Sequence, residues 1–306
     1  GILAYHANNV TIQSNDVNKS SKGIWLYECL YASIITNFVY LSDDDGILLY
    51  YTNWSTIDNN SIADSISGIL LWVSNNNTIS NNTFINCGLL PVESYDNTVT
   101  DNKVNGKPLV YVESARDTSI GIDAGQIVLV RCYNITVSGL TIENTSVGIV
   151  LVSTNSSKIL NNVIRNNRMW GIYIRKSFSN SILGNIFTNC GIRIYASFMN
   201  TISANVVNGK PLVYYEGQSN INITNAGQVI LVNCDNMRVM NLDIANASVG
   251  IDILNSTNIV ITNNTIREIR EAMVIDNSTN IEIYGNNITN TRTGILVRNS
   301  LSIMIR

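Results

Sequence analysis

Apolar and polar residues alternate along this chain in very short runs. In the run Gly148-Ile149-Val150-Leu151-Val152, apolar side chains recur with a period of two, and a Ser, Asn or Asp cluster soon follows. A period of two broken by turn residues is typical of short β-strands. No segment repeats its apolar residues at helical spacing. The pattern therefore predicts an all-β protein.

The strands belong to a short repeat. Runs that begin with Gly-Ile return about every 20 to 23 residues, at Gly23, Gly46, Gly68, Gly148, Gly171, Gly191, Gly250 and Gly294. Most continue into a tail with an apolar residue, an Asn three positions later and another apolar residue two positions after that, as in Ile57/Asn60/Ile62. Three short strands per repeat cannot bury an apolar face alone, but stacked repeats can. The pattern predicts a single-stranded parallel β-helix of about 14 coils.

The Asn of the tail has a predicted structural role. An inward-facing or corner amide can hydrogen-bond the equivalent amide one coil away, at the strand spacing of roughly 4.8 Å. Asn also tolerates the left-handed backbone of a tight corner. Leu140 and Leu242 replace the Asn at equivalent places. We therefore expect an asparagine ladder with two interruptions.

A second repeat, of about 102 residues, contains the first. Asn105-Gly106-Lys107-Pro108-Leu109 and a later Gly125-Gln126 return as Asn208-Gly209-Lys210-Pro211-Leu212 and Gly227-Gln228. The long repeats are 46–147, 148–249 and a partial 250–306. We expect one solenoid domain over 1–306, a section of a longer chain, forming a rod on the order of 65–70 Å long with open sheet edges. The segments 105–126 and 208–228 could be ordinary coils or protruding hairpins.

Charge excludes some functions. Only 13% of residues are charged and the net charge is −3, so a basic groove for nucleic acid is not expected. No apolar run is long enough for a membrane span, and no leader sequence is visible. The five cysteines include the equivalent pairs Cys87/Cys190 and Cys132/Cys234, which the long repeat places several coils apart. We expect buried free thiols.

Triplets of the form Asn-x-Ser/Thr are dense, and each could accept an N-linked glycan in an exported protein. An Asn-rich repeat also creates such triplets by chance, and any that overlap the ladder would face inward. The candidates are Asn9, Asn18, Asn53, Asn59, Asn76, Asn81, Asn134, Asn144, Asn155, Asn222, Asn246, Asn255, Asn263, Asn277 and Asn287. The prediction is an extracellular, cell-surface location.

The Gly-Ile-x-Leu and Ile-x-x-Asn-x-Ile repeats, with Asn-Gly-Lys-Pro-Leu-Val-Tyr and Gly-Gln-Val-Ile-Leu-Val-Asn-Cys between them, resemble the NosD-like right-handed parallel β-helix proteins. The resemblance covers essentially the whole chain. It implies a right-handed β-helix built from carbohydrate-binding and sugar-hydrolase-type repeats. Members are linked to copper-site maturation, to archaeal surface stalks or coats, and to polysaccharide lyases and hydrolases. Fold alone does not choose among these functions.

Candidate chemistry is sparse. Copper would need soft or imidazole ligands, yet the only histidine is His6, expected at the surface. The run Asp43-Asp44-Asp45 could be a Ca²⁺ turn or a solvated corner. The duplicated segment carries three acidic residues in its first copy, Glu113, Asp117 and Asp123, but only Glu216 in its second copy. We predict no catalytic residue and no metal site.

An aromatic stripe is the more informative feature. If Ile and Leu of the first strand in each coil point inward, the alternate positions point outward. In the first coils these include Tyr5, Trp25, Tyr27, Tyr50 and Trp72, and later coils carry mixed residues. Such a stripe could stack on sugars or pack against a neighbouring chain. Alternatively, a segment of the same chain such as 105–126 covers it.

Three functions follow. The leading hypothesis is a glycosylated structural subunit of a surface filament, stalk or S-layer-like coat, assembling through its ends or its aromatic stripe. The second is a carbohydrate-binding or adhesion module that uses the stripe. The third is a polysaccharide lyase or hydrolase that uses Asp43 to Asp45 and Glu113.

Overall fold

The computed structural model describes residues 1–306 and is built entirely of short β-strands wound into coils. Most coils contribute one strand to each of three faces, and strands of neighbouring coils pair in parallel. Inward residues such as Ile24, Leu26 and Ile47 are fully buried, while Trp25 between them is only half-buried. The alternation therefore produced the parallel β-helix that the sequence predicted.

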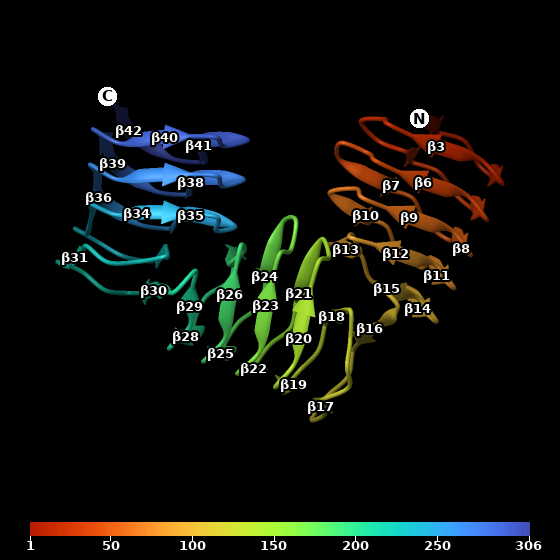
Figure 1. Ribbon diagram of the computed structural model, residues 1–306, viewed down its shortest axis with the longest axis horizontal. Coiled ribbons are helices and arrows are strands. Elements are labelled where there is room, and N and C mark those ends of the chain that lie inside the picture. The colour runs from red at the N-terminus through yellow and green to blue at the C-terminus, as the bar shows by residue number, and fades with distance from the viewer.

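The solenoid bends twice and forms an arch (Figure 1). Its three straight segments contain β1 to β15, β16 to β29 and β30 to β42, and both ends of the chain lie on the open side of the arch. The predicted straight rod is therefore wrong. The bends fall at Asn105-Gly106 and Asn208-Gly209, where the chain makes antiparallel hairpins instead of continuing the parallel winding.

The first segment has three faces. Its first face contains β1 (Ile2–Tyr5), β4 (Ile24–Tyr27), β7 (Asp45–Tyr50), β10 (Ser67–Trp72) and β13 (Leu89–Val92). Its second face contains β2 (Thr11–Gln13), β5 (Ser33–Ile35), β8 (Thr56–Asp58), β11 (Thr78–Ser80) and β14 (Thr98–Thr100). Its third face contains β3 (Asp16–Asn18), β6 (Phe38–Tyr40), β9 (Ser61–Ala63), β12 (Thr83–Ile85) and β15 (Lys103–Val104).

The second segment repeats this plan. Its first face contains β16 (Lys107–Glu113), β18 (Gln126–Val130), β21 (Val147–Val152), β24 (Trp170–Arg175) and β27 (Ile192–Tyr195). Its second face contains β17 (Ser119–Ile120), β19 (Thr136–Ser138), β22 (Lys158–Leu160), β25 (Ser181–Leu183) and β28 (Thr201–Ser203). Its third face contains β20 (Thr141–Glu143), β23 (Val163–Arg165), β26 (Ile186–Thr188) and β29 (Val206–Val207).

The third segment completes the arch. Its first face contains β30 (Lys210–Glu216), β32 (Gln228–Val232), β35 (Val249–Leu254), β38 (Glu271–Asp276) and β41 (Thr293–Arg298). Its second face contains β31 (Asn222–Ile223), β33 (Arg238–Met240), β36 (Thr257–Thr262), β39 (Thr279–Tyr284) and β42 (Leu301–Ile305). Its third face contains β34 (Asp243–Ala245), β37 (Thr265–Arg267) and β40 (Asn287–Thr289).

Each bend joins the third face of one segment to the first face of the next. β15 pairs antiparallel with β16, and β16 then pairs in parallel with β18, so one ten-stranded sheet runs through the first bend. Asn105 and Gly106 have φ of 50° and 81°, the left-handed conformations of a type I′ hairpin turn. Because the chain reverses here, the next coils wind about a new axis. The Asn-Gly-Lys-Pro-Leu motif is the bend.

The Gly-Gln motif closes the same bend. The backbone N–H of Gly125 donates to the carbonyl of Pro108 at 2.9 Å, and a Cβ on this glycine would lie 2.3 Å from the Val104 carbonyl oxygen. The next residue, Gln126, is fully buried and pairs its side-chain amide with the backbone N–H and C=O of Leu89, at 2.9 and 2.8 Å. Leu89 lies in β13, where the first face of the first segment ends. The glutamine therefore substitutes for the missing neighbour strand.

The asparagine ladder is present and restarts after each bend. Nδ2 of Asn37 donates to Oδ1 of Asn60, and Nδ2 of Asn60 donates to Oδ1 of Asn82, both at 3.0 Å. At the interruptions, the backbone N–H groups of Leu140 and Leu242 donate to Oδ1 of the next ladder amides at 3.0 Å. These leucines directly precede β20 and β34, the first third-face strands after the hairpins. A bend therefore explains each interruption.

All five cysteines are free and buried, as predicted. Burial raises the pKa of the Cys87 and Cys190 thiols to about 12. Because the thiolate is the reactive form, we expect none of the five to react with iodoacetamide at pH 8 in the native protein and all five to react in denaturant. Mass spectrometry of alkylated samples measures this. Rapid alkylation of the native chain would contradict the buried positions.

Candidate functional site

The concave side of the arch holds a cleft between the first faces of the three segments. One part, here called the Asp44 pocket, has a volume of about 290 Å³. A second part, the Arg175 pocket, has a volume of about 410 Å³. The two share Leu70, Trp72 and Met169, so they form one continuous inner cleft. Its combined size suits a ligand of several rings.

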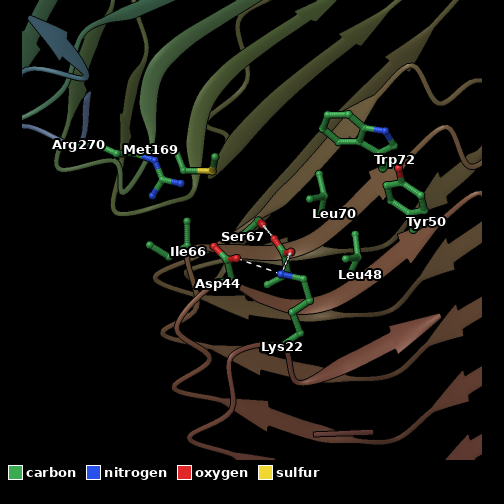
Figure 2. Close-up of a pocket in the computed structure, with 11 residues that line it drawn as sticks. Lys22, Asp44, Leu48, Tyr50, Ile66, Ser67, Leu70, Trp72, Met169 and Arg270 are labelled. Atoms are coloured by element: carbon green, nitrogen blue, oxygen red, sulfur yellow. Dashed lines mark hydrogen bonds and ion pairs between the residues drawn. The ribbon is translucent and has the colours of Figure 1, made fainter. Parts of the chain in front are cut away.

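The Asp44 pocket joins the two arms of the arch. Lys22 Nζ lies 3.0 Å from Asp44 and 3.6 Å from Asp45, and Arg292 of the third segment lies 3.1 Å from the other oxygen of Asp44. Figure 2 shows Lys22 and Asp44 near Ser67, with Arg270 and Met169 across the pocket from Tyr50 and Trp72.

The two aspartates have different environments. Burial raises the pKa of Asp45, although Ser67 and Lys22 act in the opposite direction. Burial would also raise the pKa of Asp44, but hydrogen bonds and charges from Lys22 and Arg292 outweigh it and lower that pKa. Asp43 lies apart from both and lines a separate surface pocket with Lys19 and Arg168. The acidic run is therefore divided between two sites.

The Ca²⁺ hypothesis finds no ligand cluster. Lys22 already lies against both Asp44 and Asp45. No group of three or more His, Cys, Asp or Glu side chains is arranged to hold a metal ion. His6 is exposed, as predicted, and its Nδ1 lies 3.1 Å from Glu28.

The Arg175 pocket combines rings and buried ion pairs. Arg175 is 7% exposed, contacts Glu93 and lies 4.2 Å from the ring centroid of Tyr195. Arg298 covers the same ring at 5.5 Å and binds Asp276 at 3.0 Å. The lining residues are Leu70, Trp72, Leu90, Val92, Met169, Trp170, Tyr173, Arg175, Arg193, Tyr195, Glu271 and Arg298.

Arg193 and Asp252 form the most buried ion pair of the cleft. They come from the second and third segments, and their side chains are 6% and 3% exposed. Glu271 Oε2 lies 3.8 Å from Arg193 Nε. Burial would lower the pKa of Arg193, but Asp252 and Glu271 outweigh it and raise that pKa. The pair joins the two segments at the second bend.

Several polar atoms in this pocket have no hydrogen-bond partner in the protein. Eight buried side-chain nitrogen or oxygen atoms of the chain lack one, and four of these belong to residues that line the Arg175 pocket. They are Trp170 Nε1, Arg175 Nε, Glu271 Oε2 and Arg298 Nε. Buried polar groups normally have partners, and the Arg175 pocket holds half of the unsatisfied buried side-chain atoms of the chain.

The predicted aromatic stripe is assembled as the alternation requires. Tyr5, Tyr27, Tyr50 and Trp72 stand in register on successive strands, with ring centroids 4.9, 5.1 and 6.2 Å apart. Trp25 lies in the adjacent row. The rings stack on one another, so most of their faces are occupied. A binding role for the five residues stays a prediction.

The alternative prediction, that another segment of the same chain covers the aromatic stripe, was only partly right. The segment 105–126 lies at the first bend, away from the stripe (Figure 1). Met169 and Arg270, from other segments, instead line the cleft over Leu48, Leu70 and Trp72. Neither residue was predicted from the sequence. One sequence feature could have pointed to Met169. The residue before the coil's glycine is polar in some other coils, as in Ser67 and Asp45, whereas Gly171 follows the apolar pair Met169-Trp170.

The proposed catalytic carboxylates do not converge. Glu113 accepts hydrogen bonds from Arg131 and the Tyr111 hydroxyl, both at 2.7 Å, near the first bend. Asp117 bonds Asn134 and Asp123 pairs with Lys107, each on the surface. Glu113 therefore has a structural role away from the Asp44 pocket.

The glycosylation triplets avoid the ladder. Most ladder amides are buried and the two at its ends, Asn15 and Asn286, are half-buried, whereas none of the triplet asparagines is buried. The exposed ones are Asn9, Asn18, Asn59, Asn76, Asn81, Asn134, Asn144, Asn222, Asn246, Asn263, Asn277 and Asn287, and the half-buried ones are Asn53, Asn155 and Asn255. Many occupy left-handed corners, such as Asn59 with φ of 51°. No triplet asparagine is itself a ladder residue, so none faces inward for that reason.

Comparisons with known proteins agree with the fold. The family described as right handed beta helix region matches residues 1–123 and 218–306, and the periplasmic copper-binding protein (NosD) family matches 113–226. A search of curated proteins found no match. No helix in the structure has the length and apolarity to cross a membrane.

Solved structures with a similar fold are distant. The A-module of mannuronan C-5 epimerase AlgE4 from Azotobacter vinelandii is 11% identical, with 94% of this chain and 88% of that chain covered and a TM-score of 0.25. The tailspike of E. coli bacteriophage HK620 is 12% identical, with 95% and 60% covered and a TM-score of 0.35. The adhesin PfbA of Streptococcus pneumoniae is 14% identical, with 97% and 85% covered and a TM-score of 0.28.

Likenesses this distant say nothing about activity. The family match is stronger, because the right-handed β-helix model covers more than half of the sequence and the repeats of the structure continue between the two matched ranges. The chain therefore belongs to the right-handed parallel β-helix family, with a NosD-like middle section.

Proposed function

We propose that the inner cleft binds a saccharide. The observation that carries this proposal is the inner cleft itself, whose Arg175 pocket is lined both by aromatic rings and by polar and charged side chains. Sugar hydroxyl groups both donate and accept hydrogen bonds, so one ring can satisfy donors and acceptors together. The charges of the pocket occur as pairs, which favours a ligand held mainly by hydroxyl groups and by an apolar surface.

Trp72 supplies the apolar surface. It is shared by both pockets and is 36% exposed, and one face of its ring stacks on Tyr50. The other large rings of the Arg175 pocket are occupied, since Trp170 stacks on Tyr173 at 4.5 Å and Tyr195 lies between two arginines. Trp72 stands in register between Tyr50 and Val92, and its exposed part is the best ring surface for a sugar.

The Trp72→Ala substitution tests the proposal. Loss of a buried aromatic contact at the centre of a site typically costs about 2 kcal/mol, so we expect roughly 30-fold weaker binding. Calorimetric titration with a panel of neutral and acidic oligosaccharides measures it. Trp54→Ala is the matched control, because Trp54 is 50% exposed and stacks on Tyr31 outside the cleft. Equal losses in both variants, or no binding by the unmodified chain, would reject the proposal.

Binding is proposed rather than catalysis because every acidic group of the cleft already contacts a cation. Asp44 and Asp45 share Lys22, Glu93 contacts Arg175, and Glu271 lies near Arg193. Release of shorter products from any bound oligosaccharide would replace this proposal with an enzyme.

We also propose that the chain acts in the periplasm or at the cell surface. The match to a periplasmic family and the accessible glycosylation triplets support this location. A glycosylated filament or coat subunit remains a second proposal, supported by the exposed triplets and by the stacked, exposed Tyr31 and Trp54. Electron microscopy of native particles and the mass of the intact chain test it, and unmodified single arches would exclude it.

A further inference from the structure

Tyr31 and Trp54 form an exposed aromatic pair at the corner between the first and second faces of the first segment. Their ring centroids are 5.8 Å apart with an interplanar angle of 23°, and the two residues are 55% and 50% exposed. Neither residue lines the inner cleft. Two stacked rings with this exposure form an apolar surface that the cleft does not explain.

The backbone at this corner is unfavourable for aromatic residues. Tyr31 and Trp54 have φ of 55° and 51°, in the left-handed region that bulky side chains rarely adopt. The coils on either side carry asparagines at the same corner, Asn9 with φ of 56° and Asn76 with φ of 57°. Asparagine tolerates this conformation, so the two aromatic residues are placed here against the local preference. Such strain is typical of residues that have a function.

The four residues stand in one row along the solenoid. The backbone N–H groups of Asn9, Tyr31 and Trp54 each donate to a corner carbonyl of the next coil, at 2.9, 3.2 and 3.3 Å. These bonds stack the corners in the order Asn9, Tyr31, Trp54 and Asn76, at the strand spacing of roughly 4.8 Å. Because the two rings stack on each other, the free face of Tyr31 is turned toward Asn9 and the free face of Trp54 toward Asn76.

Both asparagines of the row begin Asn-x-Thr triplets. Asn9 and Asn76 are exposed, and neither side-chain amide forms a hydrogen bond in the structure. The asparagine of a nearby triplet differs, because Asn53 is half-buried and its side-chain carbonyl accepts a hydrogen bond from the Asn75 N–H at 2.6 Å. Asn9 and Asn76 therefore present free amides beside the two open ring faces.

We propose that Asn9 and Asn76 carry N-linked glycans whose first sugars stack on Tyr31 and Trp54. A transferase supplies each glycan from a lipid-linked phosphate donor. The asparagine Nδ2 bonds to C1 of the first sugar and gives up one proton, while the bond from C1 to the phosphate oxygen breaks and the lipid phosphate leaves with the bonding electrons. This inference does not depend on saccharide binding in the inner cleft.

The row geometry favours stacking of the attached sugar. Side chains at equivalent positions of neighbouring coils extend in the same direction, so a sugar on Asn76 runs alongside the Trp54 ring. The C–H groups of a sugar ring pack against the face of an aromatic ring. Because the sugar is tethered, its effective concentration at the ring is high, and a contact of modest strength is enough to hold it.

Peptide mapping of the chain secreted from a host that attaches N-linked glycans tests the two sites. We expect glycans on Asn9 and Asn76. The Thr11→Val and Thr78→Val substitutions should each remove one of them, because they abolish the triplet and leave the asparagine and the ring in place. Finding Asn9 and Asn76 unmodified would overturn the proposal, whether or not other triplets carry glycans.

Hydroxyl-radical footprinting tests the stacking. We expect Trp54 to be oxidised severalfold more slowly in the glycosylated chain than in the Thr78→Val variant, because the sugar shields the ring. Trp72, in the inner cleft, is the internal reference and should be oxidised equally in both. Ser61→Ala is the matched control, because it removes the Asn59 triplet and leaves the row intact. Equal oxidation of Trp54 with and without the Asn76 glycan, or equal loss of protection in the control variant, would overturn the stacking.

Thermal unfolding gives an independent readout through a double-mutant cycle. In the glycosylated chain, Trp54→Ala removes the contacts of the ring with both the sugar and Tyr31, whereas in the Thr78→Val background it removes only the contact with Tyr31. We therefore expect Trp54→Ala to lower the melting temperature by about 2 °C more in the glycosylated chain than in the Thr78→Val background. Equal decreases in the two backgrounds would show that Trp54 contacts only the protein, and the stacking would be wrong.

Discussion

The Gln126→Ala substitution is expected to lower the free energy of unfolding by about 3–5 kcal/mol. The Gln126 side chain is fully buried and bonds the N–H of Leu89, the C=O of Leu89 and the C=O of Val147. Removing it leaves these buried backbone groups without the partners that replace a neighbour strand, and each such group costs about 1–3 kcal/mol. Urea unfolding monitored by circular dichroism measures the change.

The chain offers matched controls for this result. Gln218→Ala makes the same chemical change at an exposed position and should alter stability by less than about 0.5 kcal/mol. Gln228, the equivalent residue at the second bend, bonds the N–H and C=O of Ile192 and should behave like Gln126. If Gln126→Ala is no more destabilising than Gln218→Ala, the glutamine does not support the bend.

Replacing Arg193 by Leu is expected to destabilise the protein by about 3–5 kcal/mol. Arg193 and Asp252 are buried against each other, so removing the guanidinium leaves an uncompensated carboxylate inside the second bend. The cost comes from that stranded charge more than from the lost attraction. Urea unfolding measures the effect, and separation of the second and third segments would appear as increased proteolysis near the hairpin at 208–209.

The first bend suggests how to repair this variant. At the equivalent positions it has Leu90 and Val150, which belong to a buried apolar cluster. The double variant Arg193→Leu with Asp252→Val should therefore recover most of the lost stability, because apolar residues often replace a buried ion pair without loss.

A surface ion pair provides the control for this experiment. Arg267 and Asp243 are 41% and 56% exposed, and Arg267→Leu should cost less than about 1 kcal/mol. If the double variant is as unstable as Arg193→Leu alone, the stranded-charge explanation is wrong.

The local structure could be predicted because it repeats. Alternation in runs such as 148–152 predicted the strands, the period predicted the stacking of equivalent strands, and the Asn tail predicted the ladder between residues such as Asn37 and Asn60. The same alternation placed Tyr27, Tyr50 and Trp72 in one row. Each of these features depends on residues that are close in sequence or one coil apart.

The inner cleft could not be predicted, although part of its origin was visible. The repeated Asn-Gly-Lys-Pro-Leu motif was recognised, but an Asn-Gly turn alone does not say whether the winding continues or changes direction. The direction depends on which strand pairs with β16 and on the packing of Leu90 and Val92 against the next segment. The aromatic residues were therefore predicted to lie on one face of a single rod. The cleft is instead formed by the first faces of three segments.

The sequence by itself determined the coil, the ladder, the buried thiols and the outward rows of side chains, because strand alternation and in-register stacking are decided by short-range spacing. Tertiary structure alone decided the arch and the contacts that side chains of one segment make with side chains of another. Arg193 meets Asp252, Arg292 reaches Asp44, and Arg270 lies opposite Trp72. These contacts join strands that never pair, and they depend on two bends whose angles result from packing at the hairpins.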